Sequence, residues 1–247
     1  MQPARLIIDN PLSGVRNMSL DEAMLESLRD IESPTLRFYQ WTPATLSLGY
    51  FQKADDRRLH GASCDCPITR RSSGGGAIVH DRELTYSLVV PAEGGLAMKT
   101  VGLYAALHDT LIEVLKSWDV SAQYVGDGCE KKSADSPFLC FERRSCQDVI
   151  IDGMKICGSA QRRRNGAVLQ HGSVLLAQSD AAPELPGVAE LAKVEITPAE
   201  LADRWAERLT DKLDLQFDTG TYSGIELERA DRWATAKFGN SDWIRRR

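Results

Sequence analysis

No stretch of this 247-residue sequence approaches the roughly 18 consecutive apolar residues that a transmembrane helix needs. The N-terminal segment MQPARLIIDNPLSG also lacks the apolar centre of a secretory signal peptide. The formal net charge is -5 rather than positive, which argues against a general electrostatic affinity for nucleic acid. We therefore expect a cytoplasmic protein that binds neither membranes nor nucleic acid.

The six cysteines include no CxxC pair, and no histidines stand at the spacing of a zinc site. No bound metal is therefore expected, and in a cytoplasmic protein the thiols are expected to be free rather than joined in disulfides. The sequence also lacks the GxxxxGK[ST] loop and the GxGxxG turn. These absences weigh against the common nucleotide-binding sites.

The most informative segment that is present is RRSSGGGA, at residues 70–77, followed by His80. Three adjacent glycines carry no Cβ atoms and tolerate positive φ, so their backbone can approach a ligand closely and offer it N–H groups. Two arginines add planar donors suited to a phosphate or a carboxylate. The segment predicts a ligand-binding loop, with a flexible glycine turn as the structural alternative. Its candidate binding residues are Arg70, Arg71, Ser73, Gly74, Gly75, Gly76, Ala77 and His80.

Helix and strand signals alternate along the chain without regular βαβ order. This pattern favours an α+β fold with a mixed, largely antiparallel sheet flanked by helices. No linker separates two regions of different composition, so residues 1–247 are expected to form a single domain.

Short sequence patterns predict where individual strands, helices and turns lie. Strands are expected at residues 35–41, 45–49, 68–71, 77–80 and 84–90. Helices are expected from Ser19 with Glu22 in a capping box, over residues 100–118, and after the capping boxes that begin at Thr197 and Ser223. The dipeptides Asp152-Gly153 and Asn165-Gly166 predict two tight hairpin turns.

A second group of residues lies on the strands around these turns. Residues 155–161 and 170–173 are small or polar where a strand usually has branched side chains, which suggests a wall that faces a ligand. The candidates here are Lys155, Gly158, Ser159, Ala160, His171 and Gly172. Taken by itself, a lysine directly after an Asp-Gly turn is most often a solvated charge; the residues GSAQ that follow make Lys155 a candidate partner for a carboxylate, a phosphate or an acyl carbonyl. His171 and His80 suit either acid–base chemistry or structural hydrogen bonding.

Four segments, in this order and spacing, carry a family resemblance: PATLSLGYFQ (43–52), RRSSGGGAIVHD (70–81), KICGSAQ (155–161) and LQHGSVLL (169–176). Together they resemble the lipoate-protein ligase and octanoyltransferase family, whose fold is related to that of biotin-protein ligases. The resemblance covers about residues 5 to 245. It implies that the arginine–glycine loop lies beside the acyl chain and the activated head group, and that Lys155 contacts the reacting carbonyl.

Two further segments bear on the division between ligases and transferases. Residues 138–142, FLCFE, resemble the loop that carries the nucleophile in cysteine-dependent octanoyltransferases. Residues 237–243, KFGNSDW, resemble the end of the catalytic domain, so the accessory C-terminal domain of many ligases is not expected. The resemblance makes Cys140 the expected nucleophile, and a thiolate both attacks and leaves readily. As alternatives, Cys140 is a small apolar filler, or Cys129 or Cys146 takes the role.

The run Arg162-Arg163-Arg164 puts three positive charges next to the expected active-site strand, where a neutral loop would be expected. It fits a docking patch for an acidic carrier protein and, equally, a solvated hairpin tip.

The resemblance thus predicts an acyltransferase without cofactor. It would move an octanoyl or lipoyl group from acyl carrier protein to a lysine of a lipoyl domain or a glycine-cleavage H-type protein, through a thioester on Cys140. One alternative is an ATP-dependent lipoate-protein ligase that forms lipoyl-adenylate and requires ATP and Mg²⁺. The other is a non-catalytic module that binds lipoyl carriers.

Overall fold

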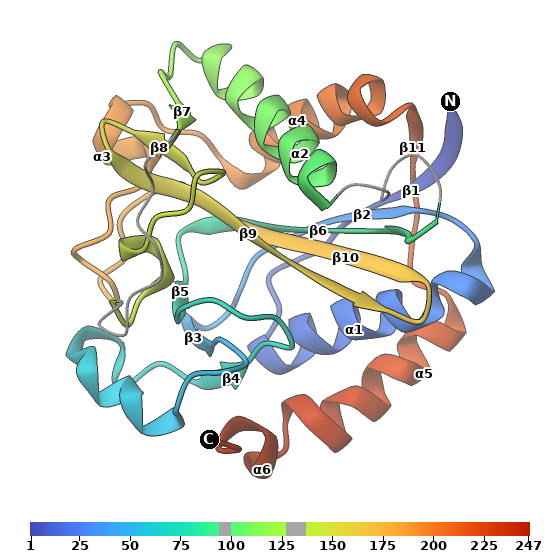
Figure 1. Cartoon of the computed structure of the whole chain (residues 1–247), viewed down its shortest axis with the longest axis horizontal. Coiled ribbons are helices and arrows are strands. Elements are labelled where there is room, and N and C mark those ends of the chain that lie inside the picture. Colours follow the sequence, from blue (N-terminus) through green and yellow to red (C-terminus); the bar gives the residue numbers. More distant parts are fainter. Residues whose placement is uncertain (94–99, 127–136) are drawn as a thin grey trace.

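The computed structural model describes residues 1–93, 100–126 and 137–247. An eight-stranded sheet runs through the molecule in the order β11-β1-β2-β6-β10-β9-β8-β7 (Figure 1). Its strands are β1 (Gln2–Ile8), β2 (Thr35–Tyr39), β6 (Glu83–Pro91), β7 (Gln123–Tyr124), β8 (Val149–Ile151), β9 (Met154–Arg164), β10 (Ala167–Leu175) and β11 (Leu215–Thr219). Strand β1 pairs in parallel with β11 and β2, and the remaining described pairs are antiparallel. The predicted mixed, largely antiparallel sheet is confirmed.

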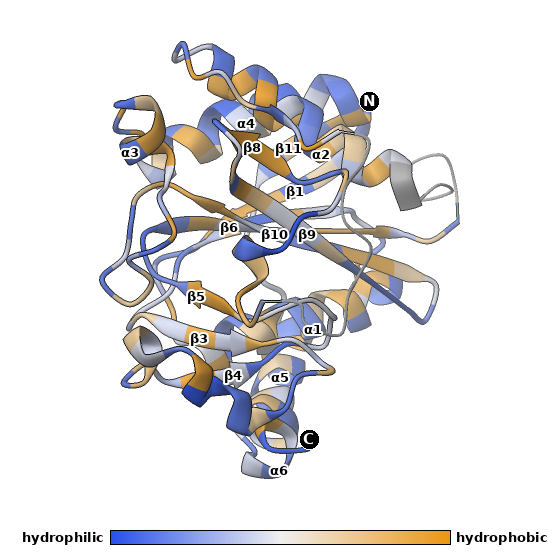
Figure 2. Ribbon diagram, turned by 60° about the vertical axis from the view of Figure 1, so that its left-hand side comes forward, coloured by the Kyte–Doolittle hydropathy of each residue, from blue (hydrophilic) through white to orange (hydrophobic). Residues whose placement is uncertain are grey.

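A second, three-stranded sheet lies beside the first, as Figure 2 shows. Its central strand β3 (Thr45–Leu48) pairs in parallel with β4 (Ile68–Arg70) and antiparallel with β5 (Ile78–His80). The glycine loop, residues 71–77, therefore connects the two outer strands of this sheet. Because β3 lies between them, the loop spans the width of the small sheet and is not a tight hairpin turn.

Helices cover both faces of the large sheet. They are α1 (Gly14–Ile31), α2 (Thr100–Lys116), α3 (Val188–Ala192), α4 (Pro198–Leu213), α5 (Gly224–Trp233) and α6 (Ser241–Ile244), with short turns η1 (Ala54–Leu59), η2 (Gly61–Ser63), η3 (Cys140–Glu142) and η4 (Ala234–Phe238). Helices α2 and α4 lie on one face, and α1 and α5 lie on the other (Figure 1). Within the described residues, no helix is both long and apolar enough to cross a membrane.

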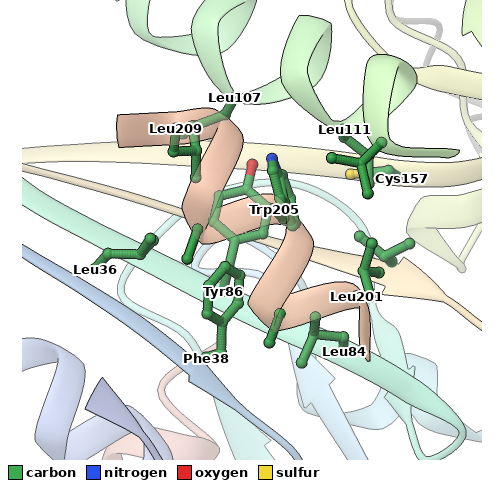
Figure 3. Packing of buried hydrophobic residues seen from close by; sticks show 14 of the residues in the cluster. Leu36, Phe38, Leu84, Tyr86, Leu107, Leu111, Cys157, Leu201, Trp205 and Leu209 are labelled. Atoms are coloured by element: carbon green, nitrogen blue, oxygen red, sulfur yellow. The ribbon is translucent and has the colours of Figure 1, made fainter. Parts of the chain in front are cut away.

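The main hydrophobic core fills the space between the sheet and helices α2 and α4 (Figure 3). Trp205 of α4 is fully buried, and its ring centroid lies 4.8 Å from that of Tyr86 and 5.7 Å from that of Phe38. The Trp205 indole N–H donates to the Thr110 hydroxyl of α2 at 2.9 Å. This contact ties the two helices together over the sheet that carries the site.

Two of the predicted hairpin turns and two of the predicted helix capping boxes are present in the structure. Both hairpin turns have positive φ at their two central residues: 48° and 78° at Asp152 and Gly153, and 50° and 75° at Asn165 and Gly166. The capping boxes at Thr197 and Ser223 are also present. These four predictions are confirmed. Each depends only on residues that are close together in the chain.

The predicted start of the first helix is wrong. Helix α1 begins after Ser13, whose side chain accepts a hydrogen bond from the Arg16 N–H. Ser19 lies inside the helix and donates to the Val15 carbonyl. Glu22 is not a capping residue either, because its buried carboxylate pairs with cations from elsewhere in the chain.

Candidate active site

A cavity of about 580 Å³ lies between the glycine loop, η3 and the paired strands β9 and β10. Most residues singled out in the sequence line it: Arg71, Gly74, Gly75, Gly76, His80, Cys140, Lys155, Gly158, Ser159, Ala160, His171 and Gly172. Arg70, Ser73 and Ala77 are close in sequence but do not line it. The structure therefore brings segments 70–80, 140, 155–160 and 171–172 to one place.

The Cys140 thiol and the Lys155 ammonium face each other in this cavity. The Lys155 Nζ lies 3.9 Å from the Cys140 Sγ and donates to the Cys140 carbonyl oxygen at 3.3 Å. On its other side, Nζ pairs with the Asp148 carboxylate at 2.8 Å. The Asp148 carboxylate in turn accepts from the Ser145 N–H at 2.7 Å. Lys155 is thus a fixed, buried charge and not the solvated one that the sequence left open.

The charge on Lys155 is maintained despite burial. Burial disfavours the ammonium, but the sulfur of Cys140 and the carboxylate of Asp148 together raise the pKa of Lys155 above its ordinary value. The close approach depends on Gly158, because a Cβ there would lie 2.5 Å from the Lys155 Cε and 3.0 Å from the Asp148 carboxylate. The ion pair occupies the space that any other residue would fill.

The backbone of Cys140 is fixed against the end of the glycine loop. Its N–H donates to the Ala77 carbonyl at 2.7 Å, and the Ala77 N–H donates to the Phe138 carbonyl at 3.0 Å. A Cβ on Gly76 would lie 2.8 Å from the Cys140 nitrogen, so only glycine permits this contact. At the preceding position, Gly75, a Cβ would point toward the Cys140 sulfur at 3.7 Å.

Arg71 uses its guanidinium to shape the loop. It donates to the carbonyl and the hydroxyl of Ser47, at 2.8 and 2.6 Å, and to the Gly76 carbonyl at 2.7 Å. The Ser47 hydroxyl is in turn hydrogen-bonded to His80 Nε2 at 2.6 Å, and His80 Nδ1 lies 2.7 Å from the Glu83 carboxylate. Burial lowers the pKa of His80, in spite of Glu83. His80 is therefore connected to the glycine loop through Ser47 and Arg71.

Arg70 is buried and lies away from the cavity. Its guanidinium donates to the backbone carbonyls of Gly49, Gln52 and Ile244, at 2.6 to 2.9 Å. These contacts join the small sheet to the C-terminal segment. Ligand binding by Arg70 remains a prediction, and the contacts that the structure records are with the protein.

His171 lies beneath the loop, between Ser73 and Asp21. Its Nε2 is hydrogen-bonded to the Ser73 hydroxyl at 2.6 Å, and its Nδ1 lies 3.6 Å from the Asp21 carboxylate. Burial raises the pKa of Asp21, but His171 and Arg37 outweigh it and hold the pKa below its ordinary value. Of the two possible roles for His171, these contacts favour structural hydrogen bonding, which includes the loop residue Ser73.

The Ser159 hydroxyl is engaged by two neighbours. It lies 2.5 Å from His108 Nε2 and is also hydrogen-bonded to the Tyr86 hydroxyl. His108 Nδ1 lies 2.6 Å from the Gln147 carbonyl, which only accepts, so Nδ1 carries the proton and Nε2 accepts from Ser159. Burial lowers the pKa of His108, which keeps its ring neutral. This side of the cavity is therefore held rigidly.

Apolar and aromatic side chains also line the cavity, among them Met18, Tyr39, Trp41 and Ile78, and the Trp41 ring stacks on His80 with 3.8 Å between centroids. A thiol with an adjacent ammonium suits nucleophilic transfer of an acyl group.

The other cysteines are less suitable as nucleophiles. Cys157 is fully buried among core side chains, and burial raises the pKa of its thiol (Figure 3). Cys64 and Cys66 are free thiols outside the cavity. Cys146 is disulfide-bonded, so the expectation of free thiols is wrong for that residue. Cys129 lies outside the described residues.

Sequence reasoning missed Asp148, which holds Lys155 in place. A signal was available, because the Asp152-Gly153 turn pairs Ile151 with Met154 and Ile150 with Lys155. Counting back along this hairpin brings Asp148 close to the strand that carries Lys155. A bulge between Val149 and Ile150 shifts the register there, and that shift was not visible in the sequence.

Residues 13–198 match the family model of the lipoyl protein ligase A/B catalytic domain. An octanoyltransferase LipM from Clostridioides difficile is 36% identical over 181 residues, which cover 71% of this chain and 66% of that relative. An octanoyltransferase LipM from Kyrpidia tusciae is 31% identical over 276 aligned positions, which cover 98% of each chain.

Among solved structures, a bipartite lipoate protein ligase from Thermoplasma acidophilum superimposes with a TM-score of 0.76 at 20% identity, over 99% of this chain and 96% of that one. At this identity the similarity concerns the fold. The predicted lipoyl protein ligase-like architecture is confirmed.

Proposed function

Since the chain belongs to the lipoyl protein ligase A/B catalytic-domain family and is an acyltransferase of protein lipoylation, we propose that it transfers an octanoyl group through a thioester on Cys140. The observation that carries the mechanism is the contact between the Cys140 Sγ and the Lys155 Nζ at 3.9 Å inside the cavity.

In the first step, the Cys140 sulfur attacks the carbonyl carbon of an octanoyl thioester. A new carbon–sulfur bond forms, the bond to the donor sulfur breaks, and the donor leaves as a thiol that takes up the proton lost by Cys140. Lys155 is placed to stabilise negative charge on the sulfur and on the carbonyl oxygen, and Asp148 keeps its ammonium in position.

In the second step, the amine of an acceptor lysine attacks the carbonyl carbon of the enzyme thioester. An amide forms, the bond to the Cys140 sulfur breaks, and the proton lost by the amine restores the thiol. Both steps exchange one acyl bond for another, so on this route neither ATP nor a metal takes part.

We propose acyl carrier protein as the donor, and a lipoyl domain or a glycine-cleavage H-type protein as the acceptor. The acceptor class is supported by the Thermoplasma acidophilum ligase, which is described with its E2 lipoyl domain as a lipoylation system. The apolar side chains of Met18, Trp41 and Ile78 in the cavity lining suit a saturated acyl chain.

The test is to incubate the pure protein with octanoyl carrier protein without ATP and to measure the mass of the intact enzyme. One octanoyl group per chain is expected, lost in Cys140→Ala and kept in Cys157→Ala. An adduct that survives Cys140→Ala contradicts the mechanism.

The same preparation separates the two alternatives. Pyrophosphate release from ATP and lipoate indicates an ATP-dependent ligase, in which Cys140 is incidental. Retained binding of a lipoyl domain without acyl transfer from any donor indicates a non-catalytic module.

A further inference from the structure

A shallow hollow of about 330 Å³ lies against the same glycine loop as the catalytic cavity. It is lined by Tyr50, Phe51, Ser72, Gly74, Arg162, Lys237 and Trp243, and is called here the Lys237 hollow. Gly74 lines both the hollow and the catalytic cavity. A Cβ on Gly74 would point toward Phe51 at 3.8 Å, whereas a Cβ on Gly75 would point toward the Cys140 sulfur. Two successive loop residues thus face the two spaces.

The hollow carries an excess of positive charge. Lys237, Arg162 and Arg164 surround the carboxylate of Glu22, at distances of 3.2, 3.2 and 2.8 Å. Three cations around one carboxylate leave a local charge of two positive units. The arginines are therefore not simply a solvated hairpin tip, because two of them pair with a buried carboxylate of α1.

An additional anion beside Lys237 would stabilise the charged form of its side chain. Its side chain is nearly buried, and its Nζ lies 4.6 Å from the ring centroid of Trp243 and 4.8 Å from that of Phe238. Burial, together with repulsion from Arg162, lowers the pKa of Lys237 to about 8 even though Glu22 raises it. The Nζ donates to the Ser72 hydroxyl at 2.7 Å, so both groups meet at the surface of the hollow.

The rim of the hollow has features of a binding surface. Phe51 is 66% exposed, although large aromatic side chains are usually covered. The guanidinium of Arg246 lies 4.2 Å from the Tyr50 ring, and that of Arg247 lies 5.4 Å from the Phe51 ring. Arginines held against exposed aromatic rings are suited to an anionic partner.

We propose that the Lys237 hollow binds the phosphodiester of the donor's prosthetic arm, so that the arm crosses Gly74 and delivers its thioester to Cys140. The inference rests on the proposed function, because carrier proteins hold acyl groups on an arm that is linked to the protein through a phosphodiester. A phosphodiester suits the hollow, since it brings one negative charge and several acceptor oxygens to an ammonium and a guanidinium. Gly74 borders both spaces, so it marks the place where such an arm would cross from one to the other.

Three donors test the proposal: octanoyl-pantetheine, which lacks the phosphate, octanoyl-phosphopantetheine, and the octanoyl carrier protein. The initial rate of Cys140 acylation is measured against donor concentration for the wild type and for Lys237→Gln. We expect Lys237→Gln to raise KM about 10-fold or more for both phosphate-bearing donors, and to leave KM for octanoyl-pantetheine unchanged. The matched control is Lys212→Gln, which removes an exposed lysine that pairs with Asp109 and should change none of the three.

An equal change in KM for all three donors contradicts the proposal. An effect confined to the carrier protein also contradicts it, since the hollow would then recognise acidic side chains of the carrier and not the phosphate. Absence of Cys140 acylation from the octanoyl carrier protein in the wild type would overturn the proposed function instead.

A binding measurement keeps the inference testable in that case and in the event that Lys237→Gln does not fold. Phosphopantetheine without an acyl group should change the fluorescence of Trp243 in the wild type and in Lys237→Arg, which preserves the charge, and much less in Arg162→Gln. Equal responses from wild type and Arg162→Gln, or no response from the wild type, would overturn the inference.

Discussion

The carboxylate of Asp148 holds the ammonium of Lys155 at 2.8 Å, and this ion pair decides where the positive charge lies relative to the Cys140 sulfur. Replacing Asp148 with Asn removes the charge but keeps the shape. A lost hydrogen bond to a charged group is worth about 1.5–3 kcal/mol, so acyl transfer should slow roughly 10- to 100-fold. The measurement is the single-turnover rate of transfer from the acylated enzyme.

If Asp148 acts by positioning Lys155, kcat should fall while KM for the donor stays nearly constant. Asp109→Asn is the control, because Asp109 is an exposed carboxylate that pairs with Lys212 outside the cavity. An unchanged kcat in Asp148→Asn would rule out the positioning role.

Gly76→Ala should disturb the nucleophile directly. The new Cβ would lie 2.8 Å from the Cys140 nitrogen and 2.9 Å from its Cα, so Cys140 must shift from its position beside Lys155. A displacement of this size can reduce the rate by about 100-fold, and we expect that loss in the acylation rate. Gly61→Ala is the control, since a Cβ there meets nothing within 4 Å. Full activity of Gly76→Ala would mean that the contact does not position Cys140.

The cysteines should differ sharply in reactivity toward iodoacetamide at neutral pH. Cys140 and the exposed Cys64 should be labelled, whereas Cys157 and Cys66 should not, because burial raises the pKa of both these thiols. Peptide mass spectrometry after a short reaction gives the extent of labelling at each site. Prior incubation with octanoyl carrier protein should protect Cys140 and leave Cys64 unprotected. Equal labelling of Cys140 with and without the donor is the contrary result.

Protein stability should fall as the pH drops below about 6.5, the ordinary pKa of histidine. Burial lowers the pKa of His80 and of His108 in the folded protein, so the unfolded chain takes up protons that the folded one resists. Each histidine then reduces the free energy of unfolding by up to about 1.4 kcal/mol per pH unit, until its lowered pKa is reached.

Urea unfolding between pH 5 and pH 7.5 measures this slope, and His108→Gln should make it shallower. The carboxylate of Glu22 does not contribute to the slope in this range. The pKa of Glu22 is lowered below 4.5 by Lys237 and Arg162, which outweigh burial, so its stabilisation is lost only at more acidic pH. A slope in His108→Gln equal to that of the wild type would show that the histidine is not responsible.

Much of the fold could be predicted because the deciding interactions are local. The Asp152-Gly153 and Asn165-Gly166 turns and the capping boxes at Thr197 and Ser223 depend on residues within four positions of one another. Strands β1 and β11 were missed because neither is stabilised locally. They pair in parallel with each other between residues 2–6 and 215–219, more than 200 residues apart, and β1 also pairs in parallel with β2, about 30 residues further along the chain.

The segment RRSSGGGA could be recognised from sequence as part of the site, and Arg71 and its three glycines line the cavity with Cys140 and Lys155. What the two arginines contact was decided by the tertiary structure. Arg70 donates to the carbonyls of Gly49 and Gln52, which follow β3, and Arg71 donates to the carbonyl of Gly76 in the loop, because buried carbonyls require donors.

By itself, the sequence determined the chemical groups of the site, the turns and caps, and the family to which the chain belongs. Only the tertiary structure decided that Asp148 holds Lys155, that Glu22 pairs with cations from two distant segments, and that Gly74 borders two spaces. The physical reason is that burial and distance set the state of a charged group, and both arise when segments far apart in the chain pack together.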